Sequence, residues 1–318
     1  RTPVASLFKS GADLRGKLRF MGSERPGGTP LRSNLMPLDR VDFTAGAIDE
    51  RDVPVESLWS RFYALNEGTP FVMSYRFEVF KRPASPMWVM VEMARYLDQI
   101  ELNGQKLEIE AQAAEQDCFD FNFDRLRLEG LREGENELKL WGKKYNNIIA
   151  MATHRALEPG EKMRAAELEA AYLMGRFKVE LTQNGPVIAG DAWDEVRESA
   201  EQAGYPFYCG ELEYEVICPE GARWMRIEAD ANAASLESHG KRQIAYIAPF
   251  EFDLDGYGAG ERIKIRLYNS LANSFGPIHL YGRNRLKMLG PGLIYNSRLY
   301  TPKAELFPFG VKNVQFYK

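Results

Sequence analysis

The stretch from Glu261 to Tyr268, ERIKIRLY, indicates the fold most directly. Ile263, Ile265 and Leu267 alternate with three basic residues, so every second side chain is apolar. Successive side chains of a β-strand point to opposite faces of the sheet, which places one set in a core and the other in water. The stretch is therefore predicted to be a half-buried antiparallel strand, and Ser74–Phe80 alternates in the same way.

The same order of predicted strands occurs twice along the chain. The first copy comprises 75–79, 88–93, 99–102, 119–123 and 137–141, and the second comprises 211–217, 224–229, 235–237, 248–254 and 262–268. Asn103-Gly104 lies between strands of the first copy, and this dipeptide strongly favours the type I′ turn of a hairpin. His239-Gly240 holds the corresponding place in the second copy. Two copies of about a hundred residues each predict two similar β-sandwiches.

We therefore expect an all-β fold of two tandem jelly-roll sandwiches with few short helices. The expected division is a linker with strands that pack on the sandwiches (1–69), the first sandwich (70–160), the second sandwich (161–282) and a C-terminal extension (283–318). Asp191–Ala203 is expected to form a short amphipathic helix before Gly204. Glu161–Met174 has the composition of a helix but also alternates like a strand, so both structures stay open there.

Composition limits the classes of function. The 318 residues carry a net charge of -4 and are 45% hydrophobic, as in ordinary globular proteins. Binding to nucleic acid is not expected, because phosphate contacts need a surplus of Lys and Arg. No apolar run approaches the roughly 20 residues of a membrane-spanning helix. The first residue is Arg and no signal segment follows it, so we expect a piece of a longer chain.

Three cysteines, Cys118, Cys209 and Cys218, cannot all pair and match no zinc or redox spacing. We expect buried free thiols. Cysteine usage leaves the compartment open between a secreted and a cytoplasmic protein.

Four segments resemble parts of one protein family. These are Asn34–Asp39, Ala171–Phe177, Gly204–Tyr214 with its GYPFYCG start, and Tyr268–His279 with its Asn-rich course. In this order they resemble the C-terminal modules of large bacterial glycosidases of the α-L-rhamnosidase type.

The resemblance implies galactose-binding-like jelly rolls, also known as the sugar-binding domain of family 2 glycoside hydrolases. It implies a partner, the upstream catalytic domain of the same polypeptide, which would carry the active carboxylates. It also favours a strand for Leu168–Met174. Two departures are His239-Gly240 in place of Asn-Gly, and Ile278-His279 in place of two histidines.

No catalytic residue and no metal ligand is predicted. A glycosidase needs two carboxylates at a defined separation, which sequence does not measure, and no barrel-like alternation of strands and long helices is present. Gly256–Gly260 is followed by a strand, whereas a phosphate-binding loop opens into a helix. Asp253 and Asp255 lack the further oxygen ligands of a calcium loop. No cofactor is expected, although the resemblance allows a structural calcium ion.

Aromatic residues give the candidate binding site. Sugars are recognised by aromatic faces together with polar groups that bind the hydroxyls. The candidate sugar contacts lie in or beside the loop that precedes Glu211 and at the exit of the second repeat: Trp193, Tyr205, Phe207, Tyr208, Glu211, Asn273 and His279. The alternative is that the loop aromatics pack into the end of the sandwich.

Three functions are consistent with the sequence. The first is an accessory carbohydrate-binding module pair of a glycoside hydrolase, which binds an oligosaccharide or glycoside and does not hydrolyse it. The second is a purely structural pair that packs on the catalytic barrel and shapes its cleft. The third is an unrelated free-standing enzyme.

Overall fold

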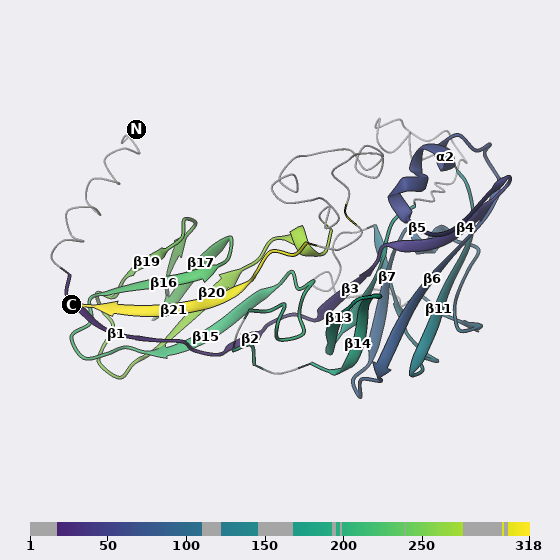
Figure 1. Cartoon of the computed structure of the whole chain (residues 1–318). Helices are drawn as coiled ribbons and strands as arrows, with labels where there is room; N and C mark the ends of the chain where they lie inside the picture. The colour runs from purple at the N-terminus through teal and green to yellow at the C-terminus, as the bar shows by residue number, and fades with distance from the viewer. Residues whose placement is uncertain are drawn as a thin grey trace, which may run out of the picture.

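The computed structural model describes residues 18–109, 122–145, 168–192, 195–197, 199–238, 240–275, 301 and 305–318. Within these ranges the chain consists mainly of strands, with one short helix, α2 (Trp59–Tyr63), and the 3-10 turns η1 (Val55–Leu58), η2 (Ala94–Tyr96) and η4 (Leu271–Asn273). The strands form two β-sandwiches that lie side by side as two lobes (Figure 1). The predicted all-β fold is confirmed. None of the described helices is long and apolar enough to cross a membrane.

The first sandwich consists of a four-stranded and an eight-stranded sheet. The four-stranded sheet has the order β10-β7-β12-β3, with β3 (Asn34–Leu38), β7 (Met87–Glu92), β10 (Phe123–Arg127) and β12 (Ala171–Gly175). The larger sheet has the order β13-β14-β6-β11-β8-β9, with β6 (Pro70–Lys81), β8 (Gln99–Leu102), β9 (Gln105–Lys106), β11 (Gly134–Lys143), β13 (Phe177–Thr182) and β14 (Gly185–Asp191). In this sheet β4 (Arg40–Ala45) pairs with both β6 and β5 (Ile48–Pro54).

The second sandwich consists of a four-stranded and a five-stranded sheet. The four-stranded sheet has the order β1-β21-β16-β19, with β1 (Phe20–Glu24), β16 (Trp224–Asp230), β19 (Phe250–Asp253) and β21 (Gly310–Tyr317). The five-stranded sheet has the order β18-β17-β20-β15-β2, with β2 (Gly28–Pro30), β15 (Glu211–Ile217), β17 (Ala233–Ser238), β18 (Lys241–Ala245) and β20 (Arg262–Tyr268).

The two sandwiches repeat the same pairing. The neighbours β6-β11-β8-β9 of the first correspond to β15-β20-β17-β18 of the second, and β10-β7-β12-β3 correspond to β19-β16-β21-β1. Every one of these pairings is antiparallel in both copies. The repeat read from the alternation is thus a structural repeat, and it includes strands that the alternation did not assign.

The sandwiches are nested in the sequence, which corrects the expected tandem division. β1 and β2 belong to the second sandwich, β3 to β14 form the first, and the chain then returns to the second at β15. The range 161–282, expected to lie in the second sandwich, includes β12, β13 and β14 of the first. β21, in the expected C-terminal extension, is an interior strand between β1 and β16.

Each sandwich has its own apolar core. β3 and β12 are buried at all of their residues, which suits neighbouring strands that are covered on both faces. In β20 only the predicted apolar set is buried, while Arg262 and Lys264 are exposed. Burial of each large apolar side chain contributes about 1.5–3 kcal/mol to folding.

Three local expectations have clear outcomes. Leu168–Met174 leads into strand β12, as the resemblance favoured. Asn103 and Gly104 have φ of 53° and 83° between β8 and β9, as a type I′ turn requires. The helix expected over Asp191–Ala203 is not found in the described part of that range, where Val196 forms an isolated β-bridge with Gly28 and turns follow from Ala200.

Candidate functional site

The aromatic loop before β15 is buried. Tyr205, Phe207 and Tyr208 expose 5%, 1% and 1% of their surface. The Tyr208 hydroxyl accepts hydrogen bonds from the backbone N–H of Leu31 and of Arg32, both at 3.1 Å, and donates to the Glu211 carbonyl at 2.7 Å. Burial raises the pKa of Tyr208 well above its usual range. These rings cannot stack on a sugar that arrives from solvent, so the candidate sugar contacts at the three positions are wrong and the packing alternative holds.

The loop joins the two cores. Phe207 packs in the core of the first sandwich, whereas Tyr205 and Tyr208 pack in the core of the second. The amide of Asn34, a buried residue at the start of β3, donates to the carbonyls of Phe177 and Gly204, both at 2.8 Å. We call residues 204–210 the joint, since they fix one sandwich to the other through apolar and hydrogen-bonded contacts.

The entry and exit of the second sandwich meet at this joint. Asn269 donates to the Tyr208 carbonyl at 2.8 Å, and the Ser274 hydroxyl donates to the Phe207 carbonyl at 2.6 Å. Asn273 is 4% exposed, and its amide donates to the Pro206 and Phe307 carbonyls.

Two more of the predicted site residues, Asn273 and Glu211, are described, and their side chains are engaged within the protein. The Asn273 oxygen accepts from the Phe307 N–H at 2.9 Å, so its amide is already used in holding the backbone. The Glu211 carboxylate pairs with Arg32 at 3.1 Å. Trp193 and His279 lie outside the described residues, and their roles stay predictions.

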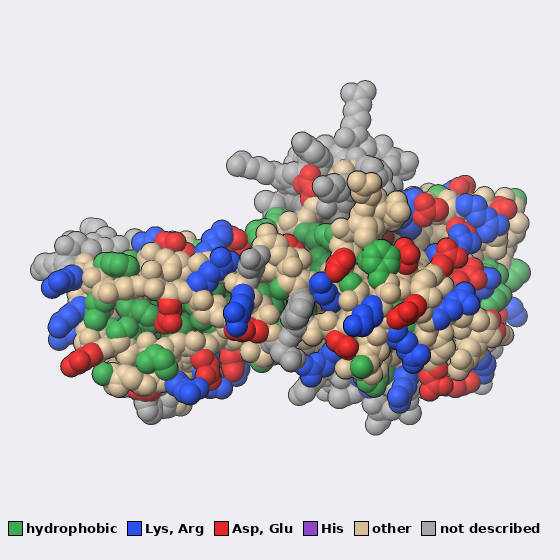
Figure 2. Space-filling model, turned by 60° about the horizontal axis from the view of Figure 1, so that its bottom comes forward, with side chains coloured by type: hydrophobic (Ala, Val, Ile, Leu, Met, Phe, Trp, Pro, Cys, Tyr) green, Lys and Arg blue, Asp and Glu red, His purple; other side chains and the backbone are tan. Residues whose placement is uncertain are grey.

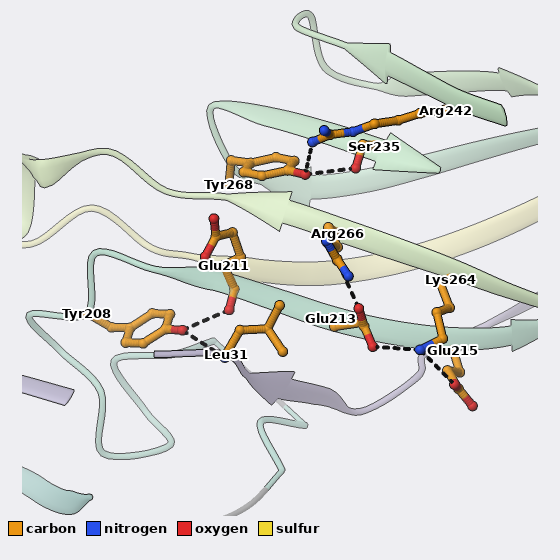
Figure 3. Close-up of polar contacts among 10 residues, drawn as sticks. All are labelled: Leu31, Tyr208, Glu211, Glu213, Glu215, Ser235, Arg242, Lys264, Arg266 and Tyr268. Carbon is orange, nitrogen blue, oxygen red and sulfur yellow. Dashed lines mark hydrogen bonds and ion pairs between the residues drawn. The ribbon is translucent and has the colours of Figure 1, made fainter. Parts of the chain in front are cut away.

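The outward face of β15 and β20 carries paired charges (Figure 3). Glu213 accepts from Arg266 at 2.8 Å and from Lys264 at 3.2 Å, and Lys264 also lies 3.9 Å from Glu215. Partial burial alone would raise the pKa of Glu213, but the hydrogen bonds and charges of Arg266 and Lys264 outweigh it and the pKa is lowered. This face is stabilised by its own ion pairs.

Tyr268 forms a separate set of contacts toward the edge of the same sheet (Figure 3). Its hydroxyl lies 2.9 Å from the Ser235 hydroxyl and accepts from Arg242 at 2.6 Å. The Arg242 guanidinium also lies 5.9 Å from the centre of the Tyr268 ring, within the range of a cation–π contact. The ring and hydroxyl are therefore both engaged by neighbours of the same sheet.

An open groove of about 450 Å³ lies on the first sandwich. Its walls come from the end of β3 with β4, the middle of β6 and the β13–β14 hairpin, and β5 and β11 add one residue each. The polar lining residues are Asp39, Arg40, Asp42, Asp52, Ser74, Arg76, Glu78, Glu135 and Asn184, and the apolar ones include Leu38, Val41, Phe77, Pro186 and Val187.

Ion pairs hold one wall of the groove. Asp42, whose side chain is 5% exposed, lies 2.7 Å from Arg76 and 3.6 Å from Arg51, and its other oxygen accepts from the Asp52 N–H at 2.8 Å. Arg40 donates to the Asp52 carboxylate at 2.8 Å. These contacts fix guanidinium and carboxylate groups in place before any ligand arrives, which reduces the entropy lost on binding.

The described residues contain no group of three or more His, Cys, Asp and Glu side chains placed to hold a metal ion. Asp253, considered above for calcium, accepts the Asp255 N–H at 2.8 Å. Cys209 and Cys218 are free thiols whose pKa is raised by burial, and Cys118 and all three histidines lie outside the described residues. Figure 2 shows acidic and basic side chains interspersed over the face that it presents.

No family model matches the sequence, and no curated protein matches it. Similar solved structures include a GH2 beta-galacturonidase from Eisenbergiella tayi (11% identity, TM-score 0.30), a Beta-D-Mannosidase from Dictyoglomus thermophilum (15%, 0.30) and a Rhamnosidase from Novosphingobium sp. PP1Y (13%, 0.25). The matches cover 75%, 74% and 87% of this chain. The chain spans only 36%, 31% and 25% of those chains, and TM-scores this low do not establish a common fold or function.

Proposed function

We propose that the chain is an accessory carbohydrate-binding module pair of a multidomain glycoside hydrolase, with the groove of the first sandwich as its sugar site. The groove carries the proposal, because it combines carboxylates, guanidiniums, an amide and a hydroxyl with an apolar wall. Polar groups of this kind bind sugar hydroxyls, and an apolar wall covers the C–H surfaces of the ring. Its volume of about 450 Å³ lies within the range of small-molecule sites.

The association with a glycoside hydrolase rests on the sequence motifs. Residues 204–214 and 268–279 resemble the entry and exit of a sandwich in glycosidases of the α-L-rhamnosidase type. The described parts of these two segments lie together at the joint. The upstream catalytic domain would then be the partner that carries the hydrolytic carboxylates.

A titration with sugars tests the binding proposal. Simple sugars and plant oligosaccharides are added to the whole chain, and binding is followed by calorimetry. Asn184 lines the groove from the exposed β13–β14 turn, so we expect Asn184→Ala to weaken binding by about fivefold or more without unfolding the chain. Gln183, its exposed neighbour, does not line the groove and provides the matched control, Gln183→Ala. Absence of binding at millimolar sugar, or equal loss in both variants, would refute the groove as the sugar site.

The joint favours a second function, a rigid structural pair that packs on a catalytic domain. Phe207 and the Asn34 amide connect the two sandwiches from within their buried parts. A connection of this kind gives the two sandwiches a fixed orientation, which a surface that shapes a cleft requires. A chain that binds none of the sugars in the titration would favour this function over the first.

A further inference from the structure

The charges along the groove are unequal in number. Five carboxylates line it, from Asp39, Asp42, Asp52, Glu78 and Glu135, against two guanidiniums, from Arg40 and Arg76. Both guanidiniums are engaged, Arg40 with Asp52 and Arg76 with Asp42. The groove therefore presents a surplus of negative charge, although acidic and basic residues of the whole chain nearly balance, with 45 against 41.

Two of the carboxylates face each other at the rim. Glu78 of β6 and Glu135 of β11 are directly opposite in register, and both are exposed. Side chains in this relation have Cβ atoms about 4.5–5.5 Å apart, and like charges placed so destabilise a sheet. Within the described part of the chain, neither carboxylate forms an ion pair with Lys or Arg. A cationic ligand group bound between these two carboxylates would relieve the repulsion between them.

Asp42, by contrast, is already neutralised within the groove wall. Its Oδ2 atom is buried and lies 2.7 Å from Arg76 and 3.6 Å from Arg51, and its Oδ1 atom accepts from the Asp52 N–H at 2.8 Å. The guanidinium of Arg76 is therefore used within the wall, and the rim pair is the place in the groove where a cationic ligand group would gain most.

We propose, on the basis of the sugar-binding function above, that the groove selects a saccharide carrying a protonated amino group and discriminates against uronates. An ammonium group supplies three donors and a positive charge, so it forms charge-assisted hydrogen bonds with carboxylates. A ligand carboxylate would be repelled by Glu78 and Glu135, and Arg40 and Arg76 are already paired. Neutral sugars bind with intermediate strength.

The test compares ligands that differ mainly in charge. Glucosamine, glucose and glucuronate, with their galacto counterparts, are titrated into the whole chain at pH 6 by calorimetry. An exposed charge pair changes an equilibrium constant by about two- to fivefold, so two carboxylates should favour the amine over the neutral sugar by roughly four- to 25-fold. High salt should reduce this ratio, since the rim charges are exposed to solvent.

Paired variants connect the effect to the rim. In Glu78→Gln/Glu135→Gln the ratio of amine to neutral affinity should fall toward one. Glu220 and Asp255 are exposed residues of the second sandwich, so Glu220→Gln/Asp255→Asn removes the same charge elsewhere and should leave the ratio unchanged. Uronate binding as tight as that of the neutral sugar, or a ratio that survives the rim variant, overturns this inference while leaving the sugar site intact. No binding by any of these sugars or the plant oligosaccharides overturns both.

Discussion

Phe207 provides the sharpest test of the joint, because it lies between two residues of one core and packs in the other. We expect Phe207→Ala to destabilise mainly the first sandwich, although Tyr205 and Tyr208 on either side belong to the second. The side chain is 1% exposed, and truncating a buried Phe to Ala costs about 3–5 kcal/mol. Since each 1.4 kcal/mol is a tenfold change, the opened population of the first sandwich should rise roughly a hundred- to several-thousand-fold.

Hydrogen exchange of the native protein measures this effect strand by strand. Amides of β7, β11 and β12 report on the first sandwich, and amides of β16 and β20 report on the second. Phe250→Ala is the matched control, because Phe250 is fully buried in the second core. We expect the two variants to lose protection in opposite sandwiches. If Phe207→Ala accelerates exchange only in β16 and β20, or lowers stability by less than about 1 kcal/mol, Phe207 does not anchor the first core.

Two further predictions concern the second sandwich. A Cβ added at Gly28 would lie 2.5 Å from the buried Tyr214 ring, so Gly28→Ala should lower the free energy of unfolding by about 1–3 kcal/mol and speed exchange in β15 and β20, whereas Gly22→Ala, with no atom within 4 Å, should not. The pKa of Glu213 is lower in the folded chain than the value near 4.3 of an unfolded Glu, so its carboxylate stabilises the fold above that pH, and this contribution is lost as pH falls through the folded pKa. Denaturation between about pH 5 and pH 3 should therefore be less acid-dependent in Glu213→Gln, and an unchanged pH profile would contradict the role of its ion pairs.

The sequence predicts the strands and the repeat well, because period-2 alternation is a local property. β20 and β6 have the expected buried faces. The nesting does not follow from the alternation, because alternation does not indicate which strands pair. β12 follows the first repeat in the sequence, yet it lies between β7 and β3. β21 lies in the expected extension, yet it is an interior strand between β1 and β16. The fully apolar Leu35–Leu38 was a signal for a strand buried on both faces.

The groove was harder to predict for a related reason. The groove is assembled from separate stretches of the sequence, near residues 36–42, 74–78 and 184–187, together with Asp52 and Glu135. No short motif marks it, although Arg76 and Glu78 stand at the outward positions of a predicted strand and Asn184-Gly185 is a turn signal. In the aromatic loop, no alternation assigns the side chains to a core, so the sequence alone favours exposed contacts there as much as packing. Phe207 is buried in the core of the first sandwich, whereas its sequence neighbours Tyr205 and Tyr208 are buried in the core of the second.

The groove and the joint share two strands, so the two candidate functions depend on one another. β3 begins at Asn34, which binds the Phe177 and Gly204 carbonyls at the joint, and its later residues Met36 to Leu38 line the groove. β13 begins at Phe177 and ends in the hairpin that supplies Asn184 to the same groove. Loss of the contacts at Gly204 would therefore free both strands at one end and loosen the groove walls at the other. A chain that holds its two sandwiches in fixed orientation also holds its groove in shape, and a rigid accessory module needs both.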